Sequence, residues 1–306
     1  MAGLACMLTI WRFTDGKRGH ENQTLGLVEA LCRLTPCKVE TLTIAKGWSS
    51  LFDWLFKRFP AGNALPKPDL IIGAGHATHW PMLAARRAHG GKIAVLMKPS
   101  LPLAWFDQVI APEHDDLTET PNRLQTKGPI NRIRPGHHDE RTGLMLIGGP
   151  SSEYGWNETA LLKQIHLIAL HQPEITWHLT TSRRTPSGFI ANVEKLGLPN
   201  LHAADHNKIS QNWLPEHLAQ SAQVWVTPDS ASMVYEALTS GAAVGCLELP
   251  FLKPGRVARG LQNLVRENRV TEFPEWERSG ILKPNTQALN EAERCAKTLL
   301  QWLKKD

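Results

Sequence analysis

The sequence is poor in cysteine and tyrosine and has no long apolar run. Its 306 residues include five scattered cysteines and no Cys-x-x-Cys pair, which argues against a disulfide framework and against a thiolate zinc site. We therefore expect reduced thiols and a cytoplasmic protein. No stretch of about 18 apolar residues occurs, so no membrane-spanning helix is predicted. The apolar start of the chain is short and lacks a preceding basic segment, so we do not interpret it as a secretory signal.

Two common nucleotide-binding motifs are also missing. The chain has neither the Gly-x-Gly-x-x-Gly pattern of nicotinamide-binding proteins nor a Walker A loop. Apolar residues make up 42% and charged residues 21%, as in a soluble globular protein, and 11 tryptophans accompany only two tyrosines. The formal charge of +5 favours an anionic ligand or a membrane surface, whereas a protein that coats nucleic acid is usually more basic.

Short apolar segments alternate with longer amphipathic segments in the first part of the chain. Because this alternation is typical of parallel sheets with helices on both faces, it predicts an α/β fold. The predicted strands are 7–13, 38–44, 69–74, 92–97 and 108–111, and the predicted helices are 23–34 and 77–89.

The alternation stops in the proline-rich residues 112–141 and then begins again. We expect a short strand or two and an inter-domain linker there. The boundaries that follow are 1–135 and 136–284 for two domains and 285–306 for a terminal helix, with a ligand at the carboxyl ends of the strands. The second domain is predicted to contain strands 144–147, 176–181, 223–227 and 243–247 and helices 159–170, 186–195 and 230–240, before the terminal helix 285–303.

Two glycine-containing loops follow strands of the first domain. The first, DGKRGHENQ at 15–23, offers backbone N–H groups and two cations to an anion, and His20 can act as a base near neutral pH. The second, GAGHATH at 73–79, is interpreted as a ligand-lining loop. Its two histidines lack a third ligand, so we expect no metal. The alternatives are a capped, solvated turn for the first loop and surface histidines for the second.

Three further segments have the composition of a phosphate and ribose site. Gly148-Gly149-Pro150-Ser151-Ser152 and Thr181-Ser182-Arg183-Arg184 each follow a strand and can supply N–H, hydroxyl and guanidinium donors. The segment 227–238 begins a helix with Asp229 and Ser230, and places Ser232 and Glu236 on one face. The alternatives are an N-capped turn, a solvated basic turn, and a helix cap with a solvated glutamate.

The segment LFDWLFKRFP, Leu51–Pro60, combines six large apolar residues with a lysine and an arginine. It is compatible with a segment that lies on an anionic membrane. A core helix with a basic edge is the interpretation we favour from the sequence.

Six motifs follow one another along the chain. They are DGKRGHENQTLGLVEAL, PDLIIGAGHATH, APEHDDL, the Gly-Gly-Pro turn, TSRRTP and VTPDSASMVYEALTSGAAV. Their order resembles the mitochondrial-fission ELM family. This plant group has bacterial relatives described as glycosyltransferases. The resemblance covers about 15–244. It implies a GT-B arrangement, in which two Rossmann-like domains face a cleft and the terminal helix crosses back to the first domain.

A more distant similarity is to the N-acetylglucosaminyltransferase that makes the lipid-linked peptidoglycan precursor. In that enzyme a glycine-rich loop ends in a histidine, as Gly16–His20 does here, and a late glutamate holds the ribose, as Glu236 would. Its Gly-Gly-Ser turn is interrupted in this chain by Pro150, which removes one N–H donor.

With this resemblance, we expect a metal-independent glycosyltransferase that moves a sugar from a nucleotide-sugar donor, which we expect to be UDP-linked, to an envelope glycan such as lipopolysaccharide or to a lipid-linked acceptor. Because the residues suggest a single catalytic base, we expect the reaction to invert the anomeric centre. No other cofactor and no nucleic-acid partner are expected, and the protein would be cytoplasmic or peripheral on the inner membrane face. The alternatives are a nucleotide-sugar epimerase of the same fold and a non-catalytic, membrane-associated scaffold.

Roles for individual residues follow from this interpretation. His20 would be the catalytic base, with Asp15 as the alternative base. The loops on the acceptor side would contribute Gly16, Lys17, Arg18, Gly19, Gly75 and His76. The nucleotide and its diphosphate would contact Ser151, Ser152, Arg183, Arg184, Asp229, Ser230, Ser232 and Glu236.

Overall fold

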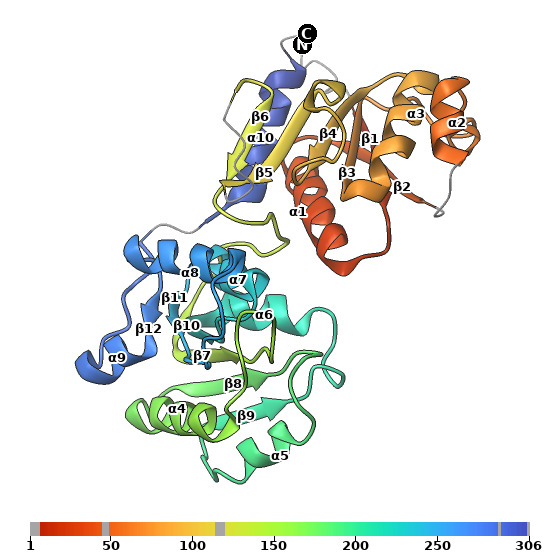
Figure 1. Ribbon diagram of the computed structural model, residues 1–306. Coiled ribbons are helices and arrows are strands. Elements are labelled where there is room, and N and C mark those ends of the chain that lie inside the picture. The colour runs from red at the N-terminus through yellow and green to blue at the C-terminus, as the bar shows by residue number, and fades with distance from the viewer. Residues whose placement is uncertain (1–6, 45–48, 114–119, 287–288, 305–306) are drawn as a thin grey trace, which may run out of the picture. The chain divides into compact units, whose positions relative to one another are not determined.

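The computed structural model describes residues 7–44, 49–113, 120–286 and 289–304. The chain divides into two compact units, which we describe separately (Figure 1). Residues 1–132 and 291–306 form the first unit, and 133–290 form the second. The division lies three residues before the boundary expected after residue 135. Residues 114–117 of the APEHDDL motif, and 287–288 of the expected terminal helix, lie outside the described residues.

The first unit is built on a six-stranded parallel sheet in the order β2-β1-β3-β4-β5-β6. Its central strands are continuously apolar, as expected for a sheet covered on both faces. The strands are β1 (Leu8–Thr14), β2 (Cys37–Thr43), β3 (Leu70–Ala74), β4 (Lys92–Leu96), β5 (Gln108–Pro112) and β6 (Arg123–Thr126).

Helices cover both faces of this first sheet. One core contains side chains of α1 (Arg18–Leu34) and α10 (Glu291–Leu303), and the other contains side chains of α3 (His79–His89). The short helix α2 (Ser49–Leu55) packs on α3. The described residues of this unit also include the 3-10 turns η1 (Pro60–Gly62), η2 (His76–Thr78) and η3 (Leu103–Trp105).

The second unit repeats the plan with a parallel sheet in the order β12-β11-β10-β7-β8-β9. Alternate residues of one strand point to opposite faces, so Met145 of β7 lies in one core and its neighbour Leu144 in the other. The elements are β7 (Asp139–Leu146), α4 (Glu158–His171), β8 (Thr176–Thr180), α5 (Phe189–Glu194), β9 (Leu201–Ala204), α6 (Trp213–Gln220), β10 (Ser221–Val226), α7 (Ala231–Ser240), β11 (Ala243–Cys246), α8 (Arg256–Arg266), β12 (Thr271–Glu272) and α9 (Phe273–Ser279).

Several expected boundaries are wrong. α1 begins at Arg18 and not at residue 23, so His20 lies in its first turn. α10 begins at Glu291, six residues after the expected start. β9, α6, α8, β12 and α9 were not predicted, because the two strands are only four and two residues long and the three helices bury only one or two residues each.

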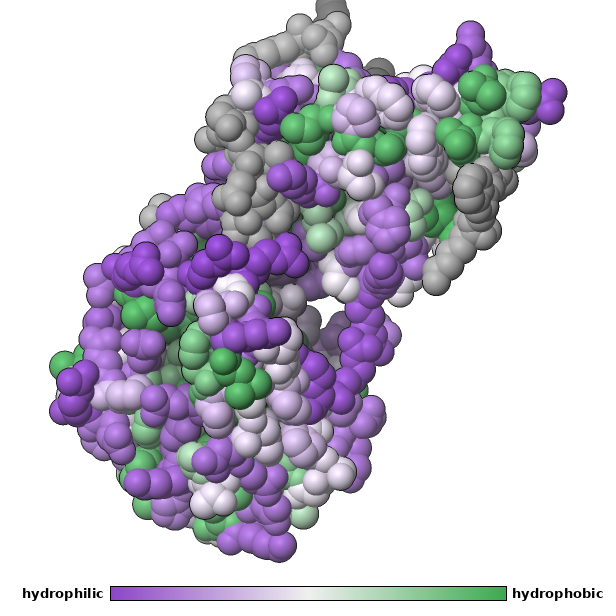
Figure 2. Space-filling model, in the orientation of Figure 1, coloured by the Kyte–Doolittle hydropathy of each residue, from purple (hydrophilic) through white to green (hydrophobic). Residues whose placement is uncertain are grey.

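The segment 51–60 is only in part the core helix that we favoured. Trp54 and Phe59 pack against the core of the first unit, whereas Phe52, Leu55 and Phe56 are exposed. Figure 2 shows hydrophobic residues gathered over α2. Within the described part of the chain, no helix is both long and apolar enough to cross a bilayer.

Candidate functional site

The two glycine loops of the first unit meet because β1 and β3 are neighbouring parallel strands. Thr14 ends β1 and holds the first loop. Its hydroxyl donates to Glu21 Oε1 (2.8 Å) and accepts the N–H of Gly16 (3.2 Å). Gly16 has a positive φ of 75°, which a residue with a side chain rarely adopts. The chain therefore turns from β1 into α1 within three residues.

This turn brings Asp15 and His20 together as a hydrogen-bonded pair. His20 Nδ1 lies 2.9 Å and 3.1 Å from the two carboxylate oxygens of Asp15. The Asp15 side chain is 4% exposed and that of His20 is 17% exposed. When Nδ1 carries the proton that it donates to Asp15, Nε2 has a free lone pair. The pair therefore presents a nitrogen base at the end of the sheet.

Two opposing effects act on the Asp15 carboxyl group. Burial by itself would raise its pKa, but the N–H of Lys17, the His20 ring and the charge of Lys17 favour the ionised form. Together these contacts hold the pKa of Asp15 below its usual value. Asp15 therefore stays ionised and accepts the Nδ1 proton of His20. This property suits a residue that orients the His20 base better than it suits a residue that is itself the base.

The second loop contacts His20 through Gly75. This glycine has a φ of 81°, and a Cβ atom at this position would overlap the imidazole ring of His20. Its carbonyl accepts the hydroxyl of Thr78 (2.8 Å). Glycine is required here both by the backbone angle and by the closeness of the ring. The structure thus brings together Asp15, His20 and Gly75.

The other acceptor-side candidates lie at the surface of the same strand ends. Lys17 is the N-cap residue of α1, and its side chain makes no capping hydrogen bond to the described helix. His79, in contrast, is buried, and burial, assisted by His76, lowers its pKa to about 4. The described residues contain no cluster of three or more metal-ligating side chains. The exposed candidates are Gly16, Lys17, Arg18, Gly19 and His76.

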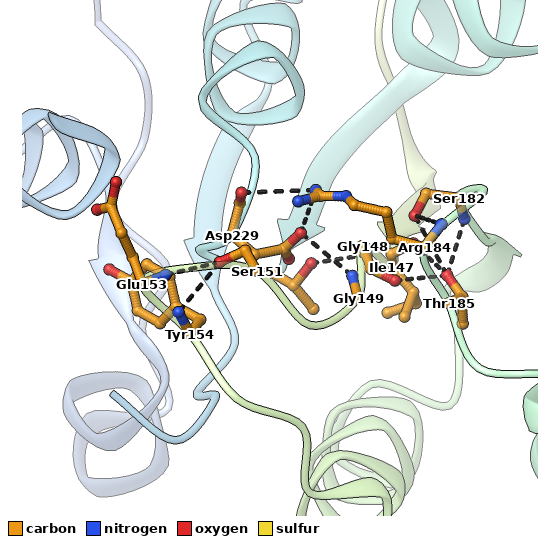
Figure 3. A network of polar contacts seen from close by, with 11 residues as sticks. Ile147, Gly148, Gly149, Ser151, Glu153, Tyr154, Ser182, Arg184, Thr185 and Asp229 are labelled. Carbon is orange, nitrogen blue, oxygen red and sulfur yellow. Dashed lines mark hydrogen bonds and ion pairs between the residues drawn. The ribbon is translucent and has the colours of Figure 1, made fainter. Parts of the chain in front are cut away.

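In the second unit, the buried Asp229 joins its own segment, 227–238, to the two other predicted segments (Figure 3). Its side chain is fully buried. One carboxylate oxygen, Oδ2, accepts the N–H of Gly149 (3.1 Å) and pairs with the guanidinium of Arg184. A Cβ atom on Gly148 would overlap this carboxylate, so the glycine lets the turn lie against Asp229. The ends of β7, β8 and β10 are thereby fixed to one another.

These contacts bear on the expectation that the backbone N–H groups of the Gly-Gly-Pro turn bind a diphosphate. The N–H of Gly148 donates to Thr227 Oγ1 (2.7 Å), and that of Gly149 donates to Asp229. The N–H of Ser151 donates to the carbonyl of Tyr154 (2.8 Å), while Pro150 has none. The N–H groups of Gly148, Gly149 and Ser151, which we expected to face a diphosphate, thus already have acceptors within the second unit. The Ser151 hydroxyl accepts the N–H groups of Glu153 and Tyr154, and Ser152 is exposed.

The N-terminus of α7 has the donors that the turn lacks. Ser230 is its N-cap residue, and its side chain makes no capping hydrogen bond in the described structure. The first N–H groups of a helix have no partner inside it, and the helix dipole adds positive charge. Ser232 is exposed in this first turn, whereas Glu236 is half-buried one turn later. Arg184 is 43% exposed, and Arg183 is exposed beside it. Helix and arginines together can bind a phosphate group.

Two threonines that we did not predict from the sequence also make hydrogen bonds in this site. Thr185 Oγ1 donates to the carbonyls of Ile147 and Gly148 and accepts the N–H of Ser182 (2.9 Å), and Thr227 accepts the N–H of Gly148. Both threonines directly follow a strand or lie near the end of one, and this position was the one feature of the sequence that could have marked them as site residues. Their partners are up to 79 residues away, and a sequence pattern does not show such pairs.

Two parallel six-stranded sheets, each with polar side chains at the carboxyl ends of its strands, define the fold class of GT-B glycosyltransferases and epimerases. This confirms the predicted class, including the return of α10 to the first unit. Residues 18–303 match the sequence profile of the mitochondrial fission ELM1 family, and the chain belongs to that family. A curated relative, the uncharacterized protein RP120 of Rickettsia prowazekii (strain Madrid E), is 23% identical, with 97% of this chain and 99% of the relative covered.

Solved structures are similar to the chain over almost its whole length. One, from Listeria monocytogenes, is assigned as a UDP-N-acetylglucosamine 2-epimerase. It has a TM-score of 0.62 and 10% identity, and 98% of each chain is covered. Another is a glycosyltransferase from Rickettsia africae ESF-5, with a TM-score of 0.53, 8% identity and 98% coverage of each chain. At these identities the similarity shows the fold.

Proposed function

We propose that this protein is a glycosyltransferase that binds a nucleotide-sugar donor through its second unit. The observation that carries the proposal is the N-terminus of α7, which presents the first N–H groups of the helix beside Arg184. Arg184 is held by the fully buried Asp229 and so is oriented before a ligand arrives. A helix N-terminus and guanidinium groups are both well suited to bind the oxygens of a diphosphate. Such a site supplies positive charge from the chain itself, which supports a metal-independent reaction.

The structure supports a positioning role for Asp229, in place of the direct ligand contact expected from the sequence. Its buried carboxylate contacts the Gly149 N–H and Arg184. Ser230, Ser232 and Arg183 remain candidates for phosphate contacts, and Glu236 remains the candidate for the ribose. We favour a UDP-linked sugar, since the Listeria protein of the same fold is assigned as a UDP-N-acetylglucosamine 2-epimerase.

The first unit would supply the base. His20 Nε2 accepts the proton of an acceptor hydroxyl, and that oxygen forms the new bond to the anomeric carbon of the sugar. The bond from this carbon to the diphosphate breaks, and the nucleoside diphosphate leaves with the bonding electrons. Arg183, Arg184 and the α7 N-terminus stabilise the charge on the leaving group. A direct displacement of this kind inverts the anomeric centre. The acceptor would be an envelope glycan or a lipid-linked glycan.

A thermal-shift screen with UDP-, GDP-, CMP- and TDP-linked sugars tests the donor site. We expect stabilisation by one class of nucleotide and its loss in the double variant Arg183→Ala/Arg184→Ala, because the diphosphate loses both guanidinium partners. Arg278→Ala, an exposed arginine of α9, is the matched control and should bind as the wild type does. Absence of stabilisation by all four classes would contradict the proposal.

The base is tested by His20→Ala once a donor is known. Loss of a positioned general base typically lowers kcat by about 10²- to 10⁴-fold, with little effect on donor affinity. Asp15→Asn should lower kcat less, because it leaves the imidazole in place. His202→Ala, which removes an exposed histidine of β9, is the control. Full transfer activity in His20→Ala would exclude His20 as the base.

An epimerase is the second candidate, because the Listeria structure reaches a TM-score of 0.62 with this chain. An epimerase converts the nucleotide sugar without an acceptor. Incubation of the protein with the donor alone, followed by chromatography of the nucleotide sugars, separates the two functions. A new nucleotide sugar of unchanged mass would favour the epimerase, whereas turnover only with an acceptor would favour the transferase.

A further inference from the structure

The surface around α2 exposes several large apolar side chains close together. Phe52 and Leu55 are each 55% exposed, and Phe56, in the turn that follows the helix, is 63% exposed. Single exposed apolar residues are common, but three large ones within five positions form a patch that signals an interaction site. The patch is visible over α2 in Figure 2.

Three tryptophans lie together behind this patch. Trp54 comes from α2, Trp80 from α3 and Trp105 from η3. Their ring centroids are 5.5 to 5.8 Å apart, and Trp54 and Trp105 are stacked at an interplanar angle of 18°. All three are only partly buried. Partly exposed indole rings, with an apolar body and one polar N–H, are enriched where proteins meet the membrane–water interface.

The charge at the edge of the patch is positive. Lys57 and Arg58 follow Phe56 directly and are exposed, and neither is ion-paired within the described residues. Arg87 of α3 is exposed too, and its guanidinium carbon lies 4.8 Å from the centroid of a Trp54 ring. Asp53 is the one acidic residue of the segment 51–60 and is half-buried. An apolar patch with three cations complements a surface of anionic headgroups over acyl chains.

The patch has a rigid base. Phe59 packs against Phe13 with ring centroids 5.6 Å apart, and its carbonyl accepts a hydrogen bond from His89 Nε2 (2.9 Å). The exposed residues are thus held on a turn whose end is fixed to the buried core. Little conformational entropy is then lost when they enter a membrane.

We propose that Phe52, Leu55, Phe56, Lys57 and Arg58, supported by the tryptophan cluster, form a docking surface for anionic lipid bilayers. The apolar side chains enter the headgroup region, and the cations contact lipid phosphates. This proposal does not depend on the glycosyltransferase proposal, since it concerns other residues and needs no nucleotide sugar.

Co-sedimentation of the full chain with vesicles tests the proposal. Vesicles in which about a third of the phosphatidylcholine is replaced by phosphatidylglycerol should bind the protein, because anionic headgroups attract the exposed cations. Pure phosphatidylcholine vesicles should bind it at least about tenfold more weakly. Binding to the anionic vesicles should also fall as salt rises, because the attraction of exposed charges is screened. Equal binding to both vesicle types, or none to either, would overturn the proposal.

Two variants and a matched control locate the surface. Phe52→Ser/Leu55→Ser/Phe56→Ser removes the apolar part, and Lys57→Glu/Arg58→Glu reverses the charge. Each should weaken binding about tenfold or more. The control is Phe251→Ser/Leu252→Ser/Lys253→Glu, which alters an equally exposed apolar and basic segment of the second unit and should bind like the wild type.

Circular dichroism and sedimentation velocity distinguish lipid docking from misfolding and from self-association. The far-UV circular dichroism and urea midpoint of each variant should match those of the wild type, because the altered side chains are exposed. Sedimentation velocity without lipid shows whether the patch instead joins two copies. A dimer that dissociates in the triple serine variant would overturn the proposal in favour of self-association, and so would vesicle binding that survives both sets of substitutions.

Discussion

At the scale of single residues, close contacts between distant parts of the chain give the candidate groups their roles. His20 is close in sequence to Asp15, so their pairing was open to prediction. Its contact with Gly75 was not, because it depends on the pairing of β1 with β3. Asp229 was predicted to contact a ligand. The structure buries its side chain against the Gly149 N–H and the Arg184 guanidinium, contacts that support the positioning role we propose for it.

The buried His79 makes stability depend on pH. Burial, assisted by His76, lowers its pKa from 6.5 to about 4, so the folded state disfavours the protonated ring. Its stabilising contribution is complete above pH 6.5 and is lost as the pH falls from 6.5 towards 4. Between pH 7 and pH 5 the loss is about 2 kcal/mol, from the linkage of proton binding to unfolding.

Urea unfolding at the two pH values measures this effect. The wild type should lose more stability on going from pH 7 to pH 5 than His79→Gln does, although the variant is less stable at pH 7. His76→Gln, which alters the exposed histidine of the same turn, should keep most of the pH dependence. An identical pH dependence in the wild type and His79→Gln would show that another group is responsible.

At the scale of elements, the central strands of the first sheet were predicted because they are mostly apolar, whereas several short or largely exposed elements were missed. β3 and β5 are buried throughout, β4 is buried after its first residue, and each was found to within one residue. α8 has two buried residues among its 11 and was missed. The start of α10 was misplaced because residues 285–290 contain no proline or glycine to mark a boundary.

α10 contributes buried side chains to the first unit, and Leu299 is among them at 1% exposure. Leu299→Ala should lower the free energy of unfolding by about 2 to 4 kcal/mol, because it leaves a cavity in the core. Urea titration monitored by circular dichroism gives the value. Thr298→Ala, at the half-buried neighbouring position, is the control and should change stability by less than about 1 kcal/mol. Similar values for the two variants would show that α10 is not an essential part of this core.

At the scale of the whole molecule, the two units have different chain connectivity. Residues 133–290 are continuous, whereas the first unit needs both 1–132 and 291–306. Each unit also has its own pair of hydrophobic cores. A domain with its own core and an uninterrupted chain can fold without the rest of the protein.

The fragment 133–290 should therefore fold when it is produced alone, whereas 1–132 should not, because it lacks α10. Cooperative urea unfolding and dispersed amide NMR signals are the criteria. If the donor site is as proposed, the isolated 133–290 fragment should also be stabilised by the nucleotide sugar that stabilises the full chain. A fragment that stays unfolded under conditions where the full chain is folded would show that the second unit depends on the first.

The sequence by itself determined the alternation of strands and helices, the α/β class and the strand ends that carry the polar loops. These features follow from the local spacing of apolar and turn residues, and the order of the motifs led to the family. The tertiary structure decided which groups in those loops are free. Gly149 and Asp229 are 80 residues apart, and their hydrogen bond exists because residues 143–146 of β7 pair with 223–226 of β10. The tryptophan cluster likewise joins three segments that only the packing of α2 on α3 and beside η3 brings together.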